Sequence, residues 1–447
     1  MKTNPRGAAL FGLLKVEKDI FISEALNLAL TQYNLSAKDQ KLMTELLYGT
    51  VRMQGTLDYY LNQISSRKLD TLDSTMRNVL RLGAYQLMFL DRVPASAAVN
   101  ESVKLAPAKN RKTLAGFING VLRNLARRQE SIEFPDLHHH PVDHIAARYS
   151  HPQWLVRRWI SRWGVQETIK LCQANNAPPL MSIRVNTLKV SVADLKAHYE
   201  ALGLTVQLGQ FAPDVLVIEQ GLRITEDPKF QAGFYYVQNE SSVLVGHALS
   251  PKPGECIYDL CSAPGGKSTH IAGLMKNQGD VLAIDQSDEK IRLIKENAAR
   301  LGITIIRPLV ADASCLPNLA PADRVVVDAP CSGLGVLRHK PDIRWRKKPQ
   351  EILTLVSIQR SILTQAADLV RPGGTLVYST CSTEREENED NILWFLDNFP
   401  EFQIQALPNW FPNGTQTMLQ ILPHQQRIDG FFICRLVRNG KKQDFSN

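Results

Sequence analysis

Two cysteines that follow apolar, strand-like runs are the residues best suited to covalent chemistry. Cys331 lies in the run DAPCSG at 328–333, and Cys381 lies in YSTCS at 378–382. Asp328 places a carboxylate at the end of the strand that leads to Cys331. Cysteines on loops after strands, beside polar residues and near a helix start, favour reactive thiolates over inert buried thiols. The pattern therefore predicts two reactive cysteines and a carboxylate at one edge of a sheet.

The remaining cysteines are interpreted as small hydrophobic side chains, which is the commonest role of a buried thiol. They are Cys172, Cys256, Cys261, Cys315 and Cys434. The seven cysteines are widely scattered in a chain of 447 residues, which is long enough to fold without covalent staples. A disulfide framework is therefore not expected, and a reducing cytoplasm fits best.

A glycine-rich turn supplies a candidate ligand site. The run DLCSAPGGK at 259–267 ends a strand-like segment and opens a helix. Glycines let a ligand approach the backbone, and a helix N-terminus favours negative charge such as a carboxylate. Asp285 and Asp312 follow the next two strands, where the first can accept hydrogen bonds from both ribose hydroxyls and the second can reach an adenine amino group. Together, the glycine-rich turn and the two aspartates predict a nucleoside cofactor. Taken alone, Asp285 could instead be a helix cap and Asp312 a turn residue.

Short apolar strands that alternate with helices position these residues. The expected strands are 257–260, 281–284, 305–306, 324–327 and 374–378, with helices near 267–276, 287–301 and 351–370. This alternation is typical of a doubly wound, Rossmann-like α/β sheet, whose ligand sites lie at the carboxyl ends of the strands. We assign that domain to 246–447 and a small α+β subdomain to 181–245, on the basis of β-prone runs at 182–185 and 215–218 around a helix at 192–202.

The N-terminal part reads as successive amphipathic helices. Residues 1–135 are predicted to form an all-α domain, and 136–180 a linker and helical connector. One window of this domain holds basic residues and no acidic one; they are Lys104, Lys109, Arg111, Lys112, Arg123, Arg127 and Arg128. Such a helix face can bind a phosphate backbone, and a solvated face without a ligand is an equal alternative.

Composition and charge indicate which classes of binding partner the chain can have. Hydrophobic residues make up 44% of the chain and charged residues 21%, and no apolar run reaches the length of a membrane span, so no membrane partner is expected. A formal net charge of +8 modestly favours polyanionic partners. The histidine run at 138–140 has no cysteine or carboxylate at a matching spacing, so no metal site is predicted.

Three motifs in a fixed order carry a resemblance to a known family. DLCxAPGGK, DAPCSG and STCS together resemble the RNA cytosine-5 methyltransferases of the Nop2/Sun (Fmu) type, as do RVNT at 184–187 and DGFF at 429–432. VNESVKLA at 99–106 and GFINGVLR at 116–123 are similar to a NusB-like RNA-binding domain. The combination resembles the bacterial Sun/Fmu branch, which modifies small-subunit (16S) ribosomal RNA, and it covers nearly the whole chain.

The resemblance implies that a methyl group passes from S-adenosyl-L-methionine to C5 of a cytosine. That carbon is a poor nucleophile, so a thiolate must first add at C6. Cys381 matches the family nucleophile, and Cys331 matches the second cysteine, implicated in product release. Asp328 would hydrogen-bond the N3 and amine edge of the base as charge develops. The target base must also leave its stack, which suits a dedicated RNA-binding domain.

The resemblance also assigns the methyl-donor site. Its residues are Cys261, Ser262, Ala263, Pro264, Gly265, Gly266, Lys267, Asp285, Asp312 and Asp328. Lys267 would lie near both the methyl donor and the base, and its role is left open. The implied partner is 16S ribosomal RNA, either naked or in a partly assembled small subunit, and a monomer is the default expectation.

Three alternatives stay open. Cys331 would be the nucleophile if the chain followed the DNA cytosine-5 methyltransferases, the substrate could be transfer RNA, or the chain could be a ribosome-assembly factor that binds RNA without catalysis.

Two positions depart from the family pattern: Asn239 stands where many relatives carry aspartate, and Arg385 replaces a common proline. The second changes the stiffness of a turn and touches no reacting group.

Overall fold

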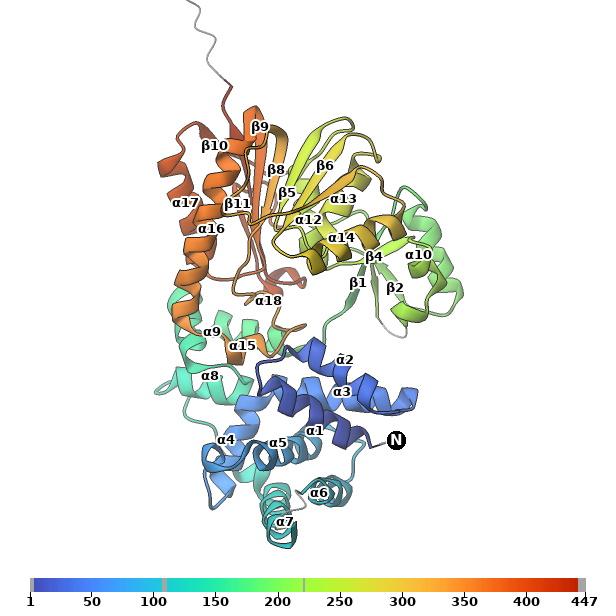
Figure 1. Cartoon of the computed structure of the whole chain (residues 1–447). Coiled ribbons are helices and arrows are strands. Elements are labelled where there is room, and N and C mark those ends of the chain that lie inside the picture. The colour runs from blue at the N-terminus through green and yellow to red at the C-terminus, as the bar shows by residue number, and fades with distance from the viewer. Residues whose placement is uncertain (1–3, 107–110, 220–221, 441–447) are drawn as a thin grey trace, which may run out of the picture. The chain divides into compact units, whose positions relative to one another are not determined.

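The computed structural model describes residues 4–106, 111–219 and 222–440 of the chain. These residues form two compact units. In Figure 1 the colour of the ribbon follows the residue number. The first unit combines Met1–Ala177 with Leu337–Lys347, here called the inserted segment, and the second combines Pro178–Val336 with Lys348–Asn447. None of the helices in the described ranges has the length and hydropathy that crossing a lipid bilayer would take.

The first unit is built from helices, as predicted (Figure 1). They are α1 (Pro5–Val16), α2 (Ile22–Gln32), α3 (Ala37–Arg52), α4 (Gln54–Ile64), α5 (Ser74–Phe89), α6 (Ala95–Lys104), α7 (Arg111–Arg128), α8 (Pro141–Tyr149), α9 (Gln153–Asn176) and the short α15 (Ile343–Arg346). Side-chain caps begin several of them. Asp73 accepts hydrogen bonds from the backbone N–H groups of Thr75 and Met76, which the first turn of α5 cannot otherwise satisfy.

The basic residues of the expected RNA-binding face fall in two groups. Lys109 and the side chain of Arg111 lie outside the described residues. The others have exposed side chains; they are Lys104, Lys112, Arg123, Arg127 and Arg128. On the opposite side of α7, Ile118, Leu122 and Leu125 are fully buried in the helical core. The helix is therefore amphipathic, with its basic residues toward solvent.

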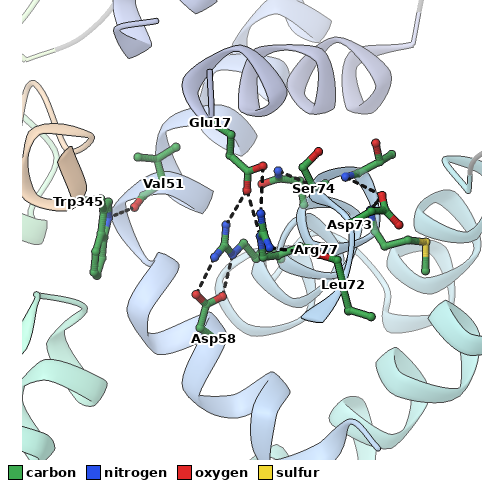
Figure 2. Close-up of polar contacts among 12 residues, drawn as sticks. Glu17, Val51, Asp58, Leu72, Asp73, Ser74, Arg77 and Trp345 are labelled. Atoms are coloured by element: carbon green, nitrogen blue, oxygen red, sulfur yellow. Dashed lines mark hydrogen bonds and ion pairs between the residues drawn. The ribbon is translucent and has the colours of Figure 1, made fainter. Parts of the chain in front are cut away.

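The inserted segment is a structural part of the helical unit. The guanidinium of Arg344 is fully buried and donates hydrogen bonds to the backbone oxygen of Ser150 at 3.0 Å and to Oδ1 of Asn176 at 2.7 Å. Figure 2 shows the ring of Trp345 directed at Val51, whose backbone oxygen accepts from Trp345 Nε1 at 2.8 Å. The inserted segment follows the Cys331 motif in the sequence. These contacts hold it in the helical unit.

An ion-pair network joins three helical segments of the same unit (Figure 2). Arg81 on α5 makes two 2.7 Å hydrogen bonds to the carboxylate of Asp58 on α4. Glu17, directly after α1, accepts from Arg77 at 3.1 Å and from Arg81 at 3.3 Å. Because Arg81 is almost completely buried, its pairing with two carboxylates is needed to offset the loss of hydration.

A small antiparallel sheet opens the second unit. Its elements are β1 (Met181–Val185), α10 (Val192–Ala201), β2 (Val206–Leu208), β3 (Val215–Ile218) and β4 (Tyr235–Val237), with strand order β2-β3-β1-β4. The hydroxyls of Tyr199 and Tyr235 both donate to the same oxygen of Asp227, at 2.5 and 2.6 Å. The predicted α+β character of this region is confirmed.

The main sheet is doubly wound (Figure 1). Its strands are β5 (Cys256–Leu260), β6 (Asp280–Asp285), β7 (Ile306–Val310), β8 (Ala322–Asp328), β9 (Val370–Thr380), β10 (Phe402–Gln405), β11 (Met418–Ile421) and β12 (Phe431–Arg438). The order is β10-β12-β9-β8-β5-β6-β7, with β11 paired to β12. Strands β5 to β9 run parallel to one another, and β12 is antiparallel to β9. The predicted Rossmann-like sheet is confirmed.

Helices cover both faces of this sheet. They are α12 (Glu240–Leu249), α13 (Gly266–Leu274), α14 (Asp288–Leu301), α16 (Pro349–Leu369) and α17 (Glu389–Asn398). Ile257 of β5 packs in the core that holds α12 and α13, whereas its neighbour Tyr258 packs in the core that holds α16 and α17. Successive side chains of a strand point to opposite faces, so strands covered on both faces read as continuous apolar runs.

Candidate active site

The strand order reverses between β5 and β8. The chain continues from β5 to β6 and β7 on one side, then crosses to β8 on the other side of β5. Such a reversal opens a crevice at the carboxyl ends of the two strands. The glycine-rich turn at 259–267 follows β5, and Asp328 is the last residue of β8. The fold therefore brings the two sequence motifs to neighbouring strand ends.

The turn after β5 has an unusual backbone. Cys261 adopts a positive φ of 66°, and Gly265, the N-cap of α13, adopts a φ of 97°. Gly265 adopts this positive φ without strain because glycine has no Cβ. Asp285, at the end of β6, is almost buried; its Oδ2 accepts from the backbone N–H of Ala263 at 3.0 Å, and its Oδ1 accepts from Lys290 Nζ at 3.0 Å. The carboxylate is thus fixed against the glycine-rich turn.

Asp312 occupies a different environment. It lies in an exposed loop after β7, where its Oδ1 accepts hydrogen bonds from the backbone N–H of Ser314 at 2.8 Å and from its hydroxyl at 2.7 Å. The backbone and hydroxyl donors of Ser314 lower the pKa of this carboxyl. This geometry is that of a turn residue, the alternative that the sequence left open.

A buried lysine pairs with the carboxylate at the end of β8. Lys267 Nζ, from the first turn of α13, donates to Asp328 Oδ2 at 2.5 Å, and the hydroxyl of Ser379 donates to Asp328 Oδ1 at 2.9 Å. Burial alone would lower the pKa of Lys267, but the negative charge of Asp328 outweighs it and raises that pKa. Lys267 therefore stays cationic, and Asp328 is held between an ammonium group and a hydroxyl.

The two predicted reactive cysteines meet. Their Sγ atoms lie 3.3 Å apart, although they come from loops after different strands. The hydrogen bond with Cys381 is the main cause, and burial the second, of a pKa of Cys331 well above its usual value. The two sulfurs thus share one S–H hydrogen bond, in which either thiol can be the donor.

Close backbone packing holds the Cys381 loop. The backbone N–H of Gly335 donates to the carbonyl of Cys381 at 2.9 Å, and the backbone N–H of Gly430 donates to the carbonyl of Gly335 at 2.9 Å. A Cβ added at Gly335 would lie 2.1 Å from the oxygen of Gly430. Only glycine fits this contact, which includes the DGFF run noted in the sequence.

A buried glutamate that sequence reasoning missed connects the two cysteine loops. Oε1 of Glu387 accepts from the backbone N–H of Ser332 at 2.8 Å, and Oε2 accepts from the hydroxyls of Ser332 and Ser382. Gln359 adds a donor at 3.0 Å. Ser332 and Ser382 each directly follow a cysteine, so one carboxylate fixes both loops. Burial raises the pKa of Glu387.

The other cysteines differ in exposure. Cys172 and Cys434 are buried, and Cys256 and Cys261 are half-buried. Cys315 is exposed, so its interpretation as a buried hydrophobic residue was wrong. The reason is its place in the loop after β7, which is the edge strand of the sheet and leaves that loop open to solvent.

The arrangement brings together groups suited to nucleophilic catalysis. The thiol pair and the carboxylate of Asp328 stand at the ends of β8 and β9, the ammonium group of Lys267 comes from the first turn of α13, and the glycine-rich turn and Asp285 stand at the ends of β5 and β6.

Three family models match successive parts of the chain. Residues 246–437 match the family described as 16S rRNA methyltransferase RsmB/F, and 3–127 match the NusB family. Residues 151–225 match the ferredoxin-like domain described for RsmF/B-like methyltransferases. Along the chain, the three matches therefore correspond in turn to the helical part, the small sheet and the large sheet.

Relatives match over nearly their full length. The "Probable ribosomal RNA small subunit methyltransferase B" of Bacillus subtilis is 40% identical, over 98% of this chain and 100% of its own. Its namesake in Synechocystis is 38% identical, over 94% and 96%. Among solved structures, PH0851 superposes with a TM-score of 0.81 at 29% identity, over 98% of this chain and 99% of that one. NSun6 from Pyrococcus horikoshii with SFG gives a TM-score of 0.59 at 25% identity, over 64% and 98%.

Proposed function

The chain belongs to the RsmB/F family of 16S rRNA methyltransferases, and we propose that it transfers a methyl group from S-adenosyl-L-methionine to C5 of one cytosine in 16S ribosomal RNA through a covalent bond between Cys381 and C6. The observation that carries this proposal is the contact between Cys331 and Cys381, 3.3 Å apart beside the Lys267–Asp328 pair. A thiolate with a second thiol and a carboxylate in reach is what addition to a pyrimidine and its later reversal require.

The residues around the glycine-rich turn fit a methyl donor of nucleoside type. The buried carboxylate of Asp285 faces the turn, where it can accept hydrogen bonds from ribose hydroxyls. A Cβ added at Gly266 would lie 3.2 Å from the ring of Tyr236, a tight contact that would require the ring to shift. When bound, S-adenosyl-L-methionine supplies an electrophilic methyl group. Asp312 is a weaker member of this site because its carboxylate closes a turn.

Addition of Cys381 activates the base. The thiolate forms a bond to C6, and the electron pair of the C5–C6 double bond moves toward C5 and the N3 edge, so that C5 becomes nucleophilic. Asp328 would accept a hydrogen bond from the exocyclic amine of the cytosine. The adjacent ammonium of Lys267 offsets the negative charge that spreads toward N3. C5 then takes the methyl group.

Cys331 serves the release step. Once Cys381 is bonded to C6, its hydrogen bond with Cys331 is lost, and Cys331 gives its proton to solvent. The Cys331 thiolate then takes the proton from C5, the double bond re-forms, and the C6–S bond breaks with its electron pair returning to Cys381.

Partners follow from the family and the helical unit. Ribosomal RNA is the substrate that the names of the relatives state, and we extend it to this chain. The exposed basic side chains of α7 suit a phosphate backbone. The proposal includes a cytoplasmic site of action and a monomeric chain, with either naked RNA or a partly assembled small subunit as substrate.

Methyl transfer with radiolabelled S-adenosyl-L-methionine and unmodified 16S ribosomal RNA tests the proposal. The parent chain should label the RNA at 5-methylcytosine. Cys381→Ala should lose transfer and keep cofactor binding, whereas Cys331→Ala should leave a protein–RNA adduct on denaturing gels. Labelling at another atom, or transfer that survives Cys381→Ala, would overturn the mechanism. Transfer to transfer RNA alone would overturn the substrate.

A further inference from the structure

Three potential metal ligands converge in the second unit, away from the cysteine pair. Asp214 directly precedes β3, His247 lies on α12, and His270 lies on α13. Their ligand atoms all lie within 4.8 Å of one another. Nε2 of His247 is 2.8 Å from Asp214 Oδ1, and Nε2 of His270 is 2.8 Å from Asp214 Oδ2. The cluster links the small sheet to two helices of the large one.

His270 is the side chain that hydrogen bonding leaves unexplained. It is 3% exposed, and within the described part of the chain its Nδ1 has no hydrogen-bond partner. Its Nε2 lies 2.8 Å from Asp214 Oδ2. A Cβ added at Gly246 would lie 2.4 Å from Nδ1, so α12 packs directly against the ring and holds it in this orientation. A buried polar atom without a partner calls for a ligand or an ion.

The donor set of the cluster is two imidazole rings and one carboxylate.

We propose that Asp214, His247 and His270 bind one divalent transition-metal ion of the zinc class, with a fourth position open to water. Two histidines and a carboxylate are ligands that Zn²⁺ accepts in tetrahedral sites. The ion would clamp the small sheet, through Asp214, to α12 and α13, and α13 also carries Lys267. The positive charge of Arg184 acts on both Asp214 and His270, so we expect weaker binding than in a site with four protein ligands.

Titration of the chelator-treated full-length chain with Co²⁺, followed by displacement with Zn²⁺, tests the site. The titrated protein should carry His138→Ala, His139→Ala and His140→Ala, because this exposed histidine run could bind metal independently. We expect one ion per chain with the visible absorption of tetrahedral Co²⁺. Loss of an outer-shell partner weakens metal sites by roughly 10- to 100-fold, so His247→Ala or Asp214→Asn, which remove a ligand, should weaken binding at least that much.

His198→Ala, in the same small subdomain but outside the cluster, is the matched control and should bind as the parent does. A rise in melting temperature on Zn²⁺ addition, present in the parent and absent in His247→Gln, gives a second readout in a variant that keeps a polar side chain. Binding that is absent, or equal in the parent and the cluster variants, would overturn the site and identify a metal-free imidazole–carboxylate cluster. None of these readouts depends on methyl transfer, so they stand apart from the proposed function.

Discussion

The sulfur atoms of Cys331 and Cys381 lie 3.3 Å apart, although the two residues are separated by 50 positions in the sequence. The contact depends on neighbouring strands, because Asp328 at the end of β8 pairs in register with Ser379 near the end of β9. A thiol this close to a second sulfur is suited to stabilising a thiolate. It is equally suited to forming a disulfide when an oxidant takes two electrons from the pair.

Mild oxidation is therefore expected to inactivate the chain reversibly. With hydrogen peroxide, the two thiols lose two protons and two electrons, the peroxide is reduced to two waters, and one Cys331–Cys381 bond forms. Methyl transfer should fall nearly to background and return with dithiothreitol, and mass spectrometry should find the two cysteine peptides linked. Exposed Cys315 oxidises independently, so Cys315→Ser should behave as the parent does. Inactivation without linked peptides would contradict the prediction.

Glu387→Gln should slow methyl transfer without weakening cofactor binding. The carboxylate accepts from Ser332, Ser382 and Gln359, and a neutral amide cannot satisfy these donors equally. Hydrogen bonds to charged groups contribute about 1.5–3 kcal/mol, so we expect roughly a 10- to 100-fold lower kcat. The measurement is kcat and KM for both substrates, together with the rate of Cys381 alkylation against pH. Glu296→Gln, on the exposed side of α14, is the control, and a loss confined to KM would count against a role in positioning the cysteines.

The sequence predicted the central sheet because the pattern that marks each strand lies within the strand itself. Strands β5, β6, β8 and β9 are covered on both faces and read as apolar runs, and the site motifs follow directly from their ends. The strands after β9 were not assigned. Strand β10 is FQIQ and β11 is MLQI, short mixed segments that form antiparallel pairs with β12 and lack a distinctive pattern.

Other features depend on distant contacts that no spacing reveals. Glu387 stands in a run with three other glutamates, and only packing shows that Glu387 and Glu384 are the buried ones. Asp214 and His247 are 33 residues apart, so their meeting is a property of the fold. The inserted segment follows the Cys331 motif in sequence yet belongs to the helical unit, because Arg344 and Trp345 bond to residues of that unit.

Asp285→Ala should weaken binding of S-adenosyl-L-methionine. The carboxylate holds the backbone of Ala263 in the glycine-rich turn and is proposed to bind the ribose, so its removal affects both the ligand and the turn. The loss of charged hydrogen bonds corresponds to roughly 10- to 100-fold in affinity. Calorimetric titration measures it, with Asp288→Ala, an exposed acid three residues further on, as the control. Equal affinity in Asp285→Ala and the parent would refute the assignment.

Asp259 should make the stability of the second unit depend on pH. The residue is fully buried on β5, and burial raises its pKa from 3.8 to about 7. The folded state then keeps a proton that the unfolded state releases above about pH 4, so unfolding becomes easier as pH rises from about 4 to 7, by up to about 4 kcal/mol in total. Asp259→Asn should remove this slope, measured by urea unfolding at several pH values. Exposed Asp397→Asn should keep it, and parallel profiles for the parent and Asp259→Asn would contradict the prediction.

Arg344→Ala should destabilise the helical unit and leave the second unit unchanged. The substitution removes hydrogen bonds to Ser150, Asn175 and Asn176, and it leaves buried acceptors and a cavity behind. Each buried acceptor without a donor costs about 1–3 kcal/mol, so a loss of about 3 kcal/mol or more is expected. Hydrogen exchange should become faster in α9 and α15, while the strands of the large sheet keep their protection. Exposed Arg92→Ala should have no such effect. Faster exchange in β8 and β9 as well would show that the inserted segment also stabilises the sheet that carries the cysteines.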